Sequence, residues 1–369
     1  MKLRYKIANG ILIVLAVLIS VLGLMVSHTK DCEPAAAITA GTETMQAAVR
    51  RCYGSPDVIE VRDIAKPKPA DDEVLVKVIA AAVNPLDWHY LRGSPYLMRL
   101  VSGLGKPDSI RMGVDYAGTV EAVGAHVTDF KRGDEVFGGK DGAFADYVTV
   151  SADRAIALKP ANMSFEQAAA VGIAGITALQ ALRDNGNLQP GQHVLINGAS
   201  GGVGTFAVQI AKAMGAEVTA VCSTRNVELV RSIGADNVFD YKKESYIDSG
   251  EQYDLIIDNV GNHGLLANTS VLKPAGTLVM IGGAKGNWIA PLLGPIKAFF
   301  LSPFVEQDLQ LILAKLSQSD LNLLGDYMRS GAVVPVIDRS YSLNELPAAI
   351  AYSEEGHARG KIIVSVNRP

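Results

Sequence analysis

Hydrophobic and polar residues follow a strand-like pattern through the first half of the chain. Between residues 45 and 160, short runs rich in β-branched residues are separated by turn signals. The predicted strands are residues 57–62, 73–83, 118–124, 130–138 and 144–150. Their spacing predicts a small antiparallel β-barrel.

From Ser164 onward the pattern changes to alternating helices and strands. Ser164 and Gln167 have the spacing of a capping box before an Ala-rich helix that extends to about Arg183. The predicted strands after it are residues 193–197, 217–222, 255–258 and 277–282, and the helices are 203–214, 227–233 and 264–272. After residue 303 come helices and then strands at 333–339 and 361–366, separated by residues 346–352. The alternation predicts a parallel, doubly wound α/β sheet.

The first 27 residues carry a different pattern. Basic residues precede an apolar run at 11–26 that only Ser20 and Gly23 interrupt. Sixteen helical residues extend roughly 24 Å, and counting from Ile7 brings the helix to the roughly 30 Å of a bilayer core. We therefore predict a transmembrane helix that anchors the chain at residues 1–27, followed by a linker at 28–44. A cleaved signal peptide is the alternative, although the residues after the run form a poor cleavage site.

Four glycines follow the predicted strand at 193–197 and lead into a helix. Gly198, Gly201, Gly202 and Gly204, with Ser200 and Val203 between them, lie in a strand-to-helix turn, which is the context of a dinucleotide-binding loop. Glycines there let the backbone approach a pyrophosphate, whose charge the helix N-terminus favours. A glycine-rich turn without a ligand is the alternative.

The residues after the next predicted strand discriminate between the two nicotinamide cofactors. NAD sites usually place an acid there to hold the ribose hydroxyls. This chain has Ser223, Thr224 and Arg225 instead, which offer hydroxyls and a guanidinium to a 2′-phosphate. We therefore predict NADPH rather than NADH, and the alternative is that Arg225 is only a solvated residue at a helix start.

Composition narrows the remaining classes of partner and of site. The net charge of −4, with both signs intermixed, gives no reason to expect a nucleic-acid partner. The three cysteines, Cys32, Cys52 and Cys222, lie far apart without a CxxC pair. That spacing argues against a disulfide framework and against a four-cysteine zinc site.

Several motifs together resemble one enzyme family. The run from Gly191 through Ala199-Ser-Gly-Gly-x-Gly204 to Gln209 and Lys212 is similar to the signature of the quinone oxidoreductase (zeta-crystallin) branch of the medium-chain dehydrogenase/reductase superfamily. The resemblance includes Asn84-Pro-Leu-Asp87 and the motifs at 113–118, 131–136 and 360–361. It implies a GroES-like catalytic domain at 45–165, a Rossmann domain at 166–304 and a return of residues 305–369 to the first domain. Residues 1–44 lie outside it.

The resemblance also bears on metal and cofactor. Zinc-dependent relatives carry a Cys where this chain has Asn84 and a His where it has Val114, so we expect no zinc. Thr177 matches a helix that runs beside the nicotinamide in relatives. Asn259 and Gly282 follow successive strands at the edge where dinucleotides bind, and Lys361 is a candidate contact to the cofactor phosphates. Ordinary turn or surface roles are the alternatives for these residues.

The expected chemistry follows from the lack of a Lewis acid. Hydride transfer to a quinone or an α,β-unsaturated carbonyl needs only hydrogen-bond donors at the oxygen that gains charge, whereas oxidation of a plain alcohol needs stronger stabilisation. Asn84 is a candidate donor in a turn, with purely local hydrogen bonds as its alternative. His89 is a candidate proton relay or a packing residue, and Tyr96 is a candidate hydroxyl donor, offset by one residue from relatives.

The leading hypothesis is a zinc-independent NADPH-dependent reductase of quinones or enones. An NADP-dependent alcohol or aldehyde oxidoreductase and an NADPH-binding sensor or scaffold with little turnover are the alternatives. The expected partners are a small carbonyl or quinone substrate, the lipid bilayer through the N-terminal helix and, because relatives are commonly dimers, a second copy. The basic residues before the apolar run favour an exported domain, whereas the cofactor favours the cytoplasmic side.

Overall fold

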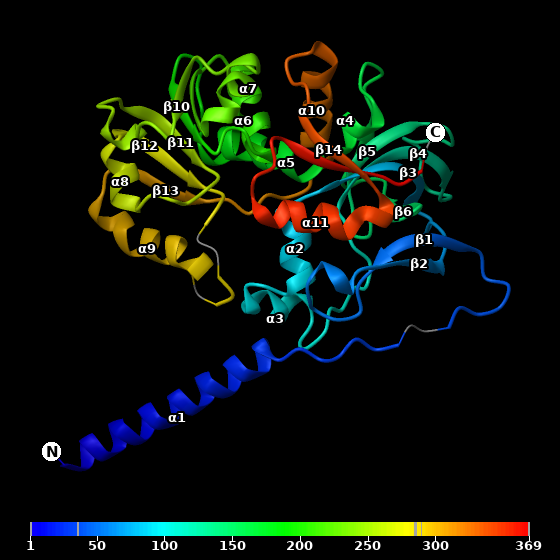
Figure 1. Ribbon diagram of the computed structural model, residues 1–369, viewed down its shortest axis with the longest axis horizontal. Coiled ribbons are helices and arrows are strands. Elements are labelled where there is room, and N and C mark those ends of the chain that lie inside the picture. Colours follow the sequence, from blue (N-terminus) through cyan, green and yellow to red (C-terminus); the bar gives the residue numbers. More distant parts are fainter. Residues whose placement is uncertain (1, 35–36, 284–285, 289, 368–369) are drawn as a thin grey trace.

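The computed structural model describes residues 2–34, 37–283, 286–288 and 290–367, and two large sheets organise this part of the chain (Figure 1). The first is a seven-stranded sheet in the order β14-β15-β3-β4-β5-β7, with β6 paired to β3. Its strands are β3 (Glu73–Val83), β4 (Asp115–Val123), β5 (Glu135–Gly139), β6 (Tyr147–Ser151), β7 (Ile156–Leu158), β14 (Ile337–Ser342) and β15 (Lys361–Ser365). A two-stranded sheet of β1 (Thr44–Val49) and β2 (Glu60–Ala65) lies beside it.

The second sheet has six parallel strands in the order β10-β9-β8-β11-β12-β13. Its strands are β8 (His193–Asn197), β9 (Glu217–Cys222), β10 (Asn237–Asp240), β11 (Tyr253–Asp258), β12 (Leu272–Met280) and β13 (Asp308–Leu311). Val194, Leu195 and Ile196 of β8 are all fully buried, as expected for a parallel strand covered on both faces. The predicted doubly wound sheet is therefore confirmed.

Helices cover both sheets and connect them (Figure 1). They are α1 (Lys2–Ser27), α2 (Pro85–Arg92), α3 (Arg99–Ser102), α4 (Phe165–Ala169), α5 (Gly172–Gln180), α6 (Gly202–Ala213), α7 (Val227–Ser232), α8 (Leu265–Ser270), α9 (Leu293–Leu301), α10 (Gln318–Ser330) and α11 (Leu346–Glu355). Short 3₁₀ turns are η1 (Pro56–Val58), η2 (Tyr96–Met98), η4 (Thr224–Asn226), η5 (Tyr246–Asp248), η6 (Ala290–Leu292), η7 (Ser302–Phe304) and η8 (Leu343–Glu345), and η3 (Ala181–Asn185) is a π turn.

One helix differs from the sequence prediction, and the pairing of the predicted last strand adds a contact that affects the site. The single helix predicted after Ser164 is divided into α4 and α5, and the first turn of α5 is held by another part of the chain. The Ile173 N–H donates to the Asp115 carboxylate of β4 at 2.8 Å, which satisfies an otherwise free helix N-terminus. The last strand, β15, pairs antiparallel with β3, with Ile362 opposite Val83. This pairing places Lys361 beside Asn84.

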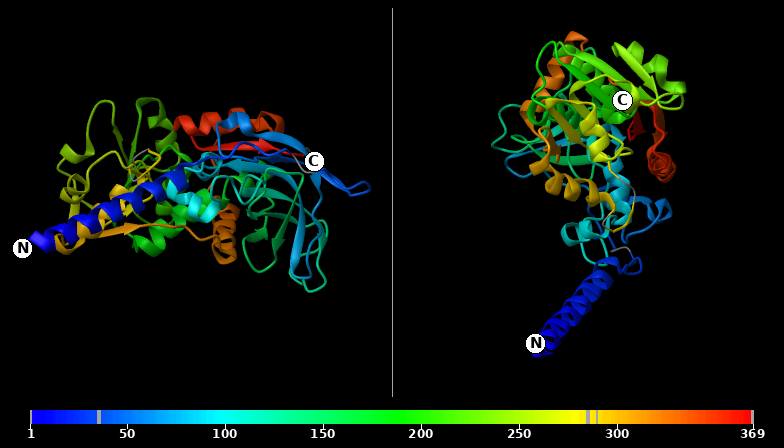
Figure 2. Two further views of the ribbon diagram at one scale, coloured as in Figure 1. Left: turned by 90° about the horizontal axis from the view of Figure 1, so that it is seen from below. Right: turned by 90° about the vertical axis from the view of Figure 1, so that its left-hand side faces the viewer.

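The predicted transmembrane anchor is wrong. Helix α1 forms and projects from the body of the molecule (Figure 2), but no helix in the described part of the chain is long and apolar enough to cross a membrane. The apolar run has only sixteen residues, about 24 Å of helix, and the extension toward Ile7 includes the polar Asn9. At its other end, Val26 is only 1% exposed because the last turn of α1 packs on the protein.

A disulfide joins two of the three cysteines, which the cysteine spacing did not lead us to expect. Cys32 and Cys52 are bonded with their Cα atoms 4.7 Å apart, and Cys222 is free and buried. The fold brings the two residues together because the segment after α1 runs along the end of β1. The bridge therefore fixes part of the predicted linker to the first sheet region.

Candidate functional site

The glycine turn between β8 and α6 leaves part of its main chain bare. Gly198 has φ +75°, a left-handed conformation that favours glycine, and a Cβ on Gly204 would lie 2.2 Å from the Gly198 carbonyl oxygen. These two glycines are therefore required by the turn itself. A Cβ on Gly201, however, would meet only the Gly198 oxygen at 3.5 Å, and one on Gly202 would meet the Lys361 Cδ at 3.2 Å. The protein's own packing leaves room at Gly201 that a ligand can use.

The turn opens the twelve-residue helix α6, whose N-cap is Gly201. The first N–H groups of a helix lack internal partners and carry the positive end of its dipole, so this point suits a diphosphate. Val203 lies half-buried in the first turn and packs on the core of the sheet. Ser200 accepts a hydrogen bond from Asn226 Nδ2 at 2.8 Å, which fixes its hydroxyl at the side of the turn. The arrangement fits a dinucleotide.

Asn259 and Gly282 follow β11 and β12 at the same edge of the sheet as the glycine turn, and β11 is the strand that pairs with β8. Asn259 donates from Nδ2 to the Asn197 carbonyl at 2.8 Å, while its buried Oδ1 has no hydrogen-bond partner within the described structure. A buried acceptor without a donor costs about 1–3 kcal/mol, which a ligand donor at this position would remove. A Cβ on Gly282 would lie 2.1 Å from the Asn259 oxygen, so Gly282 is required for close packing of the two turns.

The candidate 2′-phosphate residues meet a further arginine that the sequence did not single out. Arg359 donates from Nε to Asn226 Oδ1 at 2.8 Å and lies against the Arg225 carbonyl. Arg225 itself donates to the His357 carbonyl at 2.9 Å, and Ser223 accepts from Asn226 Nδ2 at 3.2 Å. Two guanidinium groups and a hydroxyl therefore gather here. Both arginines are exposed and lie within reach of a ligand.

Thr224 and Thr177 make hydrogen bonds within the protein. The Thr224 hydroxyl donates to Asp240 Oδ2 at 2.7 Å, so it faces an acid rather than the two arginines. The Thr177 hydroxyl donates to the Ile173 carbonyl one turn earlier in α5, at 2.7 Å. Each oxygen can still accept a hydrogen bond, but neither proton is free for a ligand.

Asn84 belongs to a buried network of charged groups. Its Oδ1 accepts from the Lys361 ammonium at 2.5 Å, and its Nδ2 donates to Asp115 Oδ2 at 2.9 Å. Lys361 also lies 3.2 Å from the Val83 oxygen and 3.4 Å from Asp115 Oδ2. All three side chains are at most 2% exposed. Both ends of the Asn84 amide are therefore occupied in this structure, and its sequence-based role as a donor to substrate stays a prediction.

Burial shifts the pKa values of this network in the direction that favours the neutral forms of its groups. It lowers the pKa of the Lys361 ammonium, an effect that Asp115 opposes, and it raises the pKa of Asp115. Burial also raises the pKa of Asp87, the third helical residue of α2, to about 7, although the Asn84 N–H donates to its carboxylate at 2.7 Å. The stem of Lys361 lies against Gly202, so this network touches the glycine turn directly.

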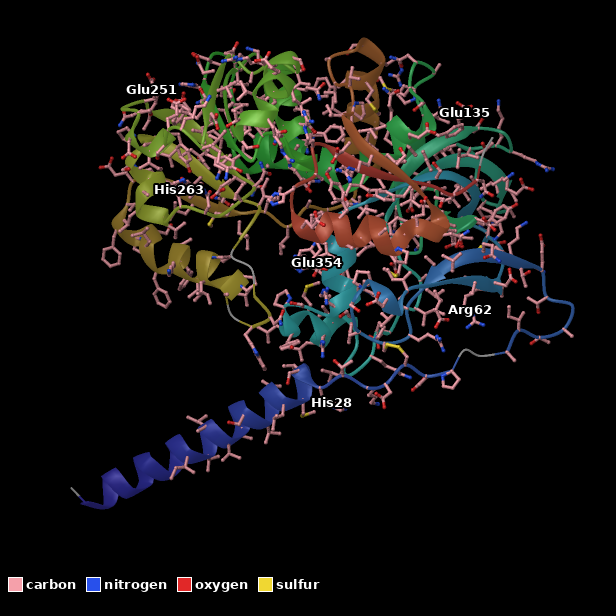
Figure 3. The ribbon with its side chains drawn as sticks, viewed as in Figure 1. His28, Arg62, Glu135, Glu251, His263 and Glu354 are labelled. Carbon is pink, nitrogen blue, oxygen red and sulfur yellow. A yellow bond between two sulfur atoms is a disulfide. The ribbon has the colours of Figure 1, made fainter. Side chains whose placement is uncertain are left out.

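His89 and Tyr96 lie at the other end of α2. His89 Nδ1 is 2.7 Å from the Ser94 carbonyl, which makes Nδ1 the protonated nitrogen and leaves Nε2 as the acceptor. Burial lowers the pKa of His89, so the neutral ring is favoured. The half-buried Tyr96 packs edge-on against Trp288 with ring centroids 4.9 Å apart. Figure 3 labels Glu354 of α11, which pairs with Arg92 and holds this end of α2 in place.

The donor set around Asn84 does not fit zinc. Zinc sites use Cys, His or carboxylate ligands, and no group of three or more such residues that would hold a metal occurs in the described residues. Asn84 Oδ1 already binds an ammonium group, whose charge repels a cation. The groups around Asn84 are therefore joined to one another by hydrogen bonds and do not form a set of metal ligands.

Asp115 and Arg359 are the site residues that sequence reasoning missed. Asp115 lies in the apolar run at 112–118, where an acid at a buried strand position was an available signal. Arg359 directly precedes Gly360 and Lys361, and nothing in the local sequence indicates that it reaches residues 223–226.

A GroES-like sheet joined to a parallel dinucleotide-binding sheet defines the class of the medium-chain dehydrogenases and reductases. Residues 70–160 match the family described as alcohol dehydrogenase GroES-like domain, and residues 233–364 match the family described as zinc-binding dehydrogenase. The quinone oxidoreductase from Coxiella burnetii superposes with a TM-score of 0.78 at 28% identity, covering 88% of this chain and 100% of that one.

Two curated relatives are similar over most of their length. The chain is 34% identical over 327 residues to a 2-methylene-furan-3-one reductase of Solanum lycopersicum, covering 85% of this chain and 76% of that protein. It is 34% identical over 323 residues to a quinone oxidoreductase of Sus scrofa, covering 84% and 93%. The chain belongs to the quinone oxidoreductase branch of the medium-chain dehydrogenase/reductase superfamily. It is an oxidoreductase of a family that uses nicotinamide cofactors.

Proposed function

We propose that the protein is an NADPH-dependent reductase that transfers hydride to a quinone or an α,β-unsaturated carbonyl. The observation that carries this proposal is the bare main chain at Gly201, at the head of α6, which has no packing reason within the protein. The two relatives named for a furanone and for a quinone support the same acceptor class.

The residues of this chain hold the cofactor at three points. The N–H groups from Gly201 onward bind the diphosphate, with the stem of Lys361 against Gly202. Arg225 and Arg359 pair with the 2′-phosphate, which NADH lacks, and this pairing is the basis of the preference for NADPH. Asn259 Oδ1, which has no partner within the described structure, accepts a hydrogen bond from the cofactor. When bound, the reduced nicotinamide supplies the hydride.

The catalytic residues act on the acceptor oxygen and its proton. The Tyr96 hydroxyl donates a hydrogen bond to the oxygen that gains charge, an effect of a few kcal/mol that suits an already electrophilic acceptor. Because His89 is neutral with its proton on Nδ1, its Nε2 accepts a proton and passes it on rather than storing one. Lys361 and Asp115 fix Asn84, and through it the start of α2, on which His89 lies.

Oxidation of NADPH in the presence of 1,2-naphthoquinone or an open-chain enone tests this function. We expect turnover with both acceptors, faster with NADPH than with NADH, and none with a simple alcohol and NADP⁺. Tight NADPH binding without turnover across such acceptors contradicts the proposal and favours a binding protein. The homodimer expected from the resemblance stays a prediction, which light scattering of the purified protein tests.

A further inference from the structure

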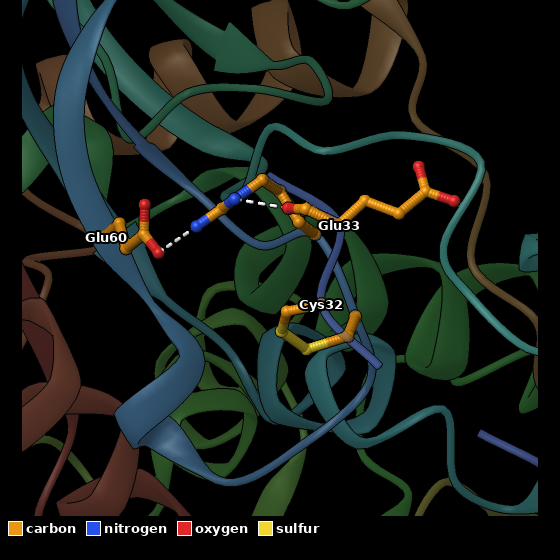
Figure 4. Close-up of a disulfide and its surroundings, with 5 residues drawn as sticks. Cys32, Glu33 and Glu60 are labelled. Carbon is orange, nitrogen blue, oxygen red and sulfur yellow. Dashed lines mark hydrogen bonds and ion pairs between the residues drawn. A yellow bond between two sulfur atoms is a disulfide. The ribbon is translucent and has the colours of Figure 1, made fainter. Parts of the chain in front are cut away.

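The segment after α1, which lies outside the family resemblance, is fixed to the region that carries Tyr96. The Lys30 N–H donates to the Gly105 carbonyl at 2.8 Å, and Lys106 pairs with Glu33 at 2.7 Å. The disulfide between Cys32 and Cys52 joins the same segment to the end of β1, and Arg51 bridges Glu33 and Glu60 there (Figure 4). Residues 26–33 are therefore a strap across this face of the protein, and His28 marks its start in Figure 3.

Arg99 is the central contact of this strap. Its side chain is buried, with the residue only 3% exposed, and Nη1 donates to three carbonyls at residues 26–28 and to Thr29 Oγ1 at 3.0–3.2 Å. Nε donates to the Gly93 carbonyl at 2.8 Å and Nη2 to the Arg92 carbonyl at 3.1 Å. Five of these acceptors are main-chain carbonyls at or just beyond the C-terminal ends of α1 and α2, where the helix dipoles are negative. Two helix ends thus supply hydrogen-bond acceptors to the buried guanidinium.

The same guanidinium lies between two aromatic rings. It is 4.5 Å from the ring centroid of Tyr53 and 4.6 Å from that of Tyr96. Tyr96 contacts Trp288 as well, and its N–H donates to the Asn287 carbonyl at 2.7 Å. Trp288 in turn packs against α1, where a Cβ on Gly23 would lie 3.6 Å from the indole. Tyr96 is therefore held both by Arg99 and by the loop that follows β12.

We propose that Arg99 is a positioning residue that sets Tyr96 for the acceptor, and that the strap at residues 26–33 is the support that holds Arg99. The inference rests on the proposed function, in which the Tyr96 hydroxyl contacts the acceptor. A planar guanidinium bound at six acceptors has one orientation, and the ring stacked on it shares that order. None of the hydrogen bonds that Arg99 makes within the described residues goes to the glycine turn, so we expect its effect on the acceptor side of the reaction.

Replacement of Arg99 by methionine in the full-length protein tests this role, because Met keeps the length of the stem and removes the guanidinium fork. We expect the KM for 1,2-naphthoquinone to rise by about tenfold, with the Kd for NADPH within about twofold of the wild type. Arg132→Met is the matched control, because Arg132 is exposed on the turn between β4 and β5 and makes a surface ion pair with Glu121. Equal rises in acceptor KM and NADPH Kd, or an unchanged acceptor KM, overturn the proposal.

Two further measurements keep the test decisive. If Arg99→Met does not fold, the double variant Cys32→Ser/Cys52→Ser loosens the strap and leaves Arg99 intact. We expect the acceptor KM of this double variant to rise. An acceptor KM equal to that of the wild type refutes the role of the strap. If the wild type shows no turnover, the proposed function has failed, and Trp288 decides the Arg99 proposal separately. In a Trp88→Phe background, loss of Arg99 should increase acrylamide quenching of Trp288, and unchanged quenching contradicts it.

Discussion

The buried pair of Lys361 and Asp115 gives the most quantitative prediction. Asp115 is fully buried, and without Lys361 it keeps two donors, the Ile173 N–H at 2.8 Å and Asn84 Nδ2 at 2.9 Å, but loses the positive charge that lies beside it. Removing one partner of a buried ion pair costs about 3–5 kcal/mol of the free energy of unfolding. We therefore expect Lys361→Met to lower the free energy of unfolding by about 3–5 kcal/mol when Asp115 is ionised.

The loss should depend on pH, because Asp115 can take up a proton instead of remaining charged. Burial raises the pKa of Asp115 in the folded state. When the folded pKa of a carboxyl group is raised, the free energy of unfolding of the protein falls as the pH rises through that range. Protonating Asp115 costs about 1.4 kcal/mol per pH unit above its unfolded pKa of about 4. Lys361→Met should thus lose only about 1.5 kcal/mol near pH 5 and the full amount near pH 8.

Urea unfolding followed by tryptophan fluorescence at the two pH values measures both losses. The control is the double variant Lys361→Met/Asp115→Asn, in which the Asn84 amide is free to turn and pair with the new amide. It should recover at least about 1.5 kcal/mol near pH 8 and show no added pH dependence. A loss below about 1 kcal/mol near pH 8, or the same loss at both pH values, refutes the reasoning.

Three other predictions follow from the same contacts. Gly201→Ala should leave the free energy of unfolding within about 1 kcal/mol of the wild type and weaken NADPH binding by at least tenfold, about 1.4 kcal/mol. Gly204→Ala should lower the free energy of unfolding by several kcal/mol, because its Cβ would lie 2.2 Å from the Gly198 oxygen. Urea unfolding and NADPH titration measure the two quantities. Arg359→Ala should raise the Kd for NADPH and leave that for NADH unchanged, and equal rises contradict a 2′-phosphate contact. Since the folded pKa of Asp87 is raised to about 7, stability should fall as the pH rises from about 4 to about 7, and Asp87→Asn should flatten urea-derived stabilities across that window.

Much of the fold was predictable because its signals are local. The capping box at Ser164 and Gln167, the buried strand at residues 193–197 and the glycines after it each depend on neighbours along the chain. The length of the apolar run at residues 11–26 was also a local signal, and the prediction of an anchor failed because the run was extended over residues that are not all apolar. The disulfide was missed because the distance between two cysteines in sequence says little about their distance in space.

By itself, the sequence determined the two kinds of sheet, the dinucleotide-type turn from Gly198 to Gly204 and the family, since periodicity and turn chemistry are written in consecutive residues. Only the tertiary structure decided which groups meet. The antiparallel pairing of β15 with β3 carries Lys361 to Asn84, 277 positions away along the chain, and the docking of α1 carries its free carbonyls to Arg99. The physical reason is that burial, not sequence distance, selects these partners: a charge that is taken out of water must be met by whichever polar groups the packing places beside it.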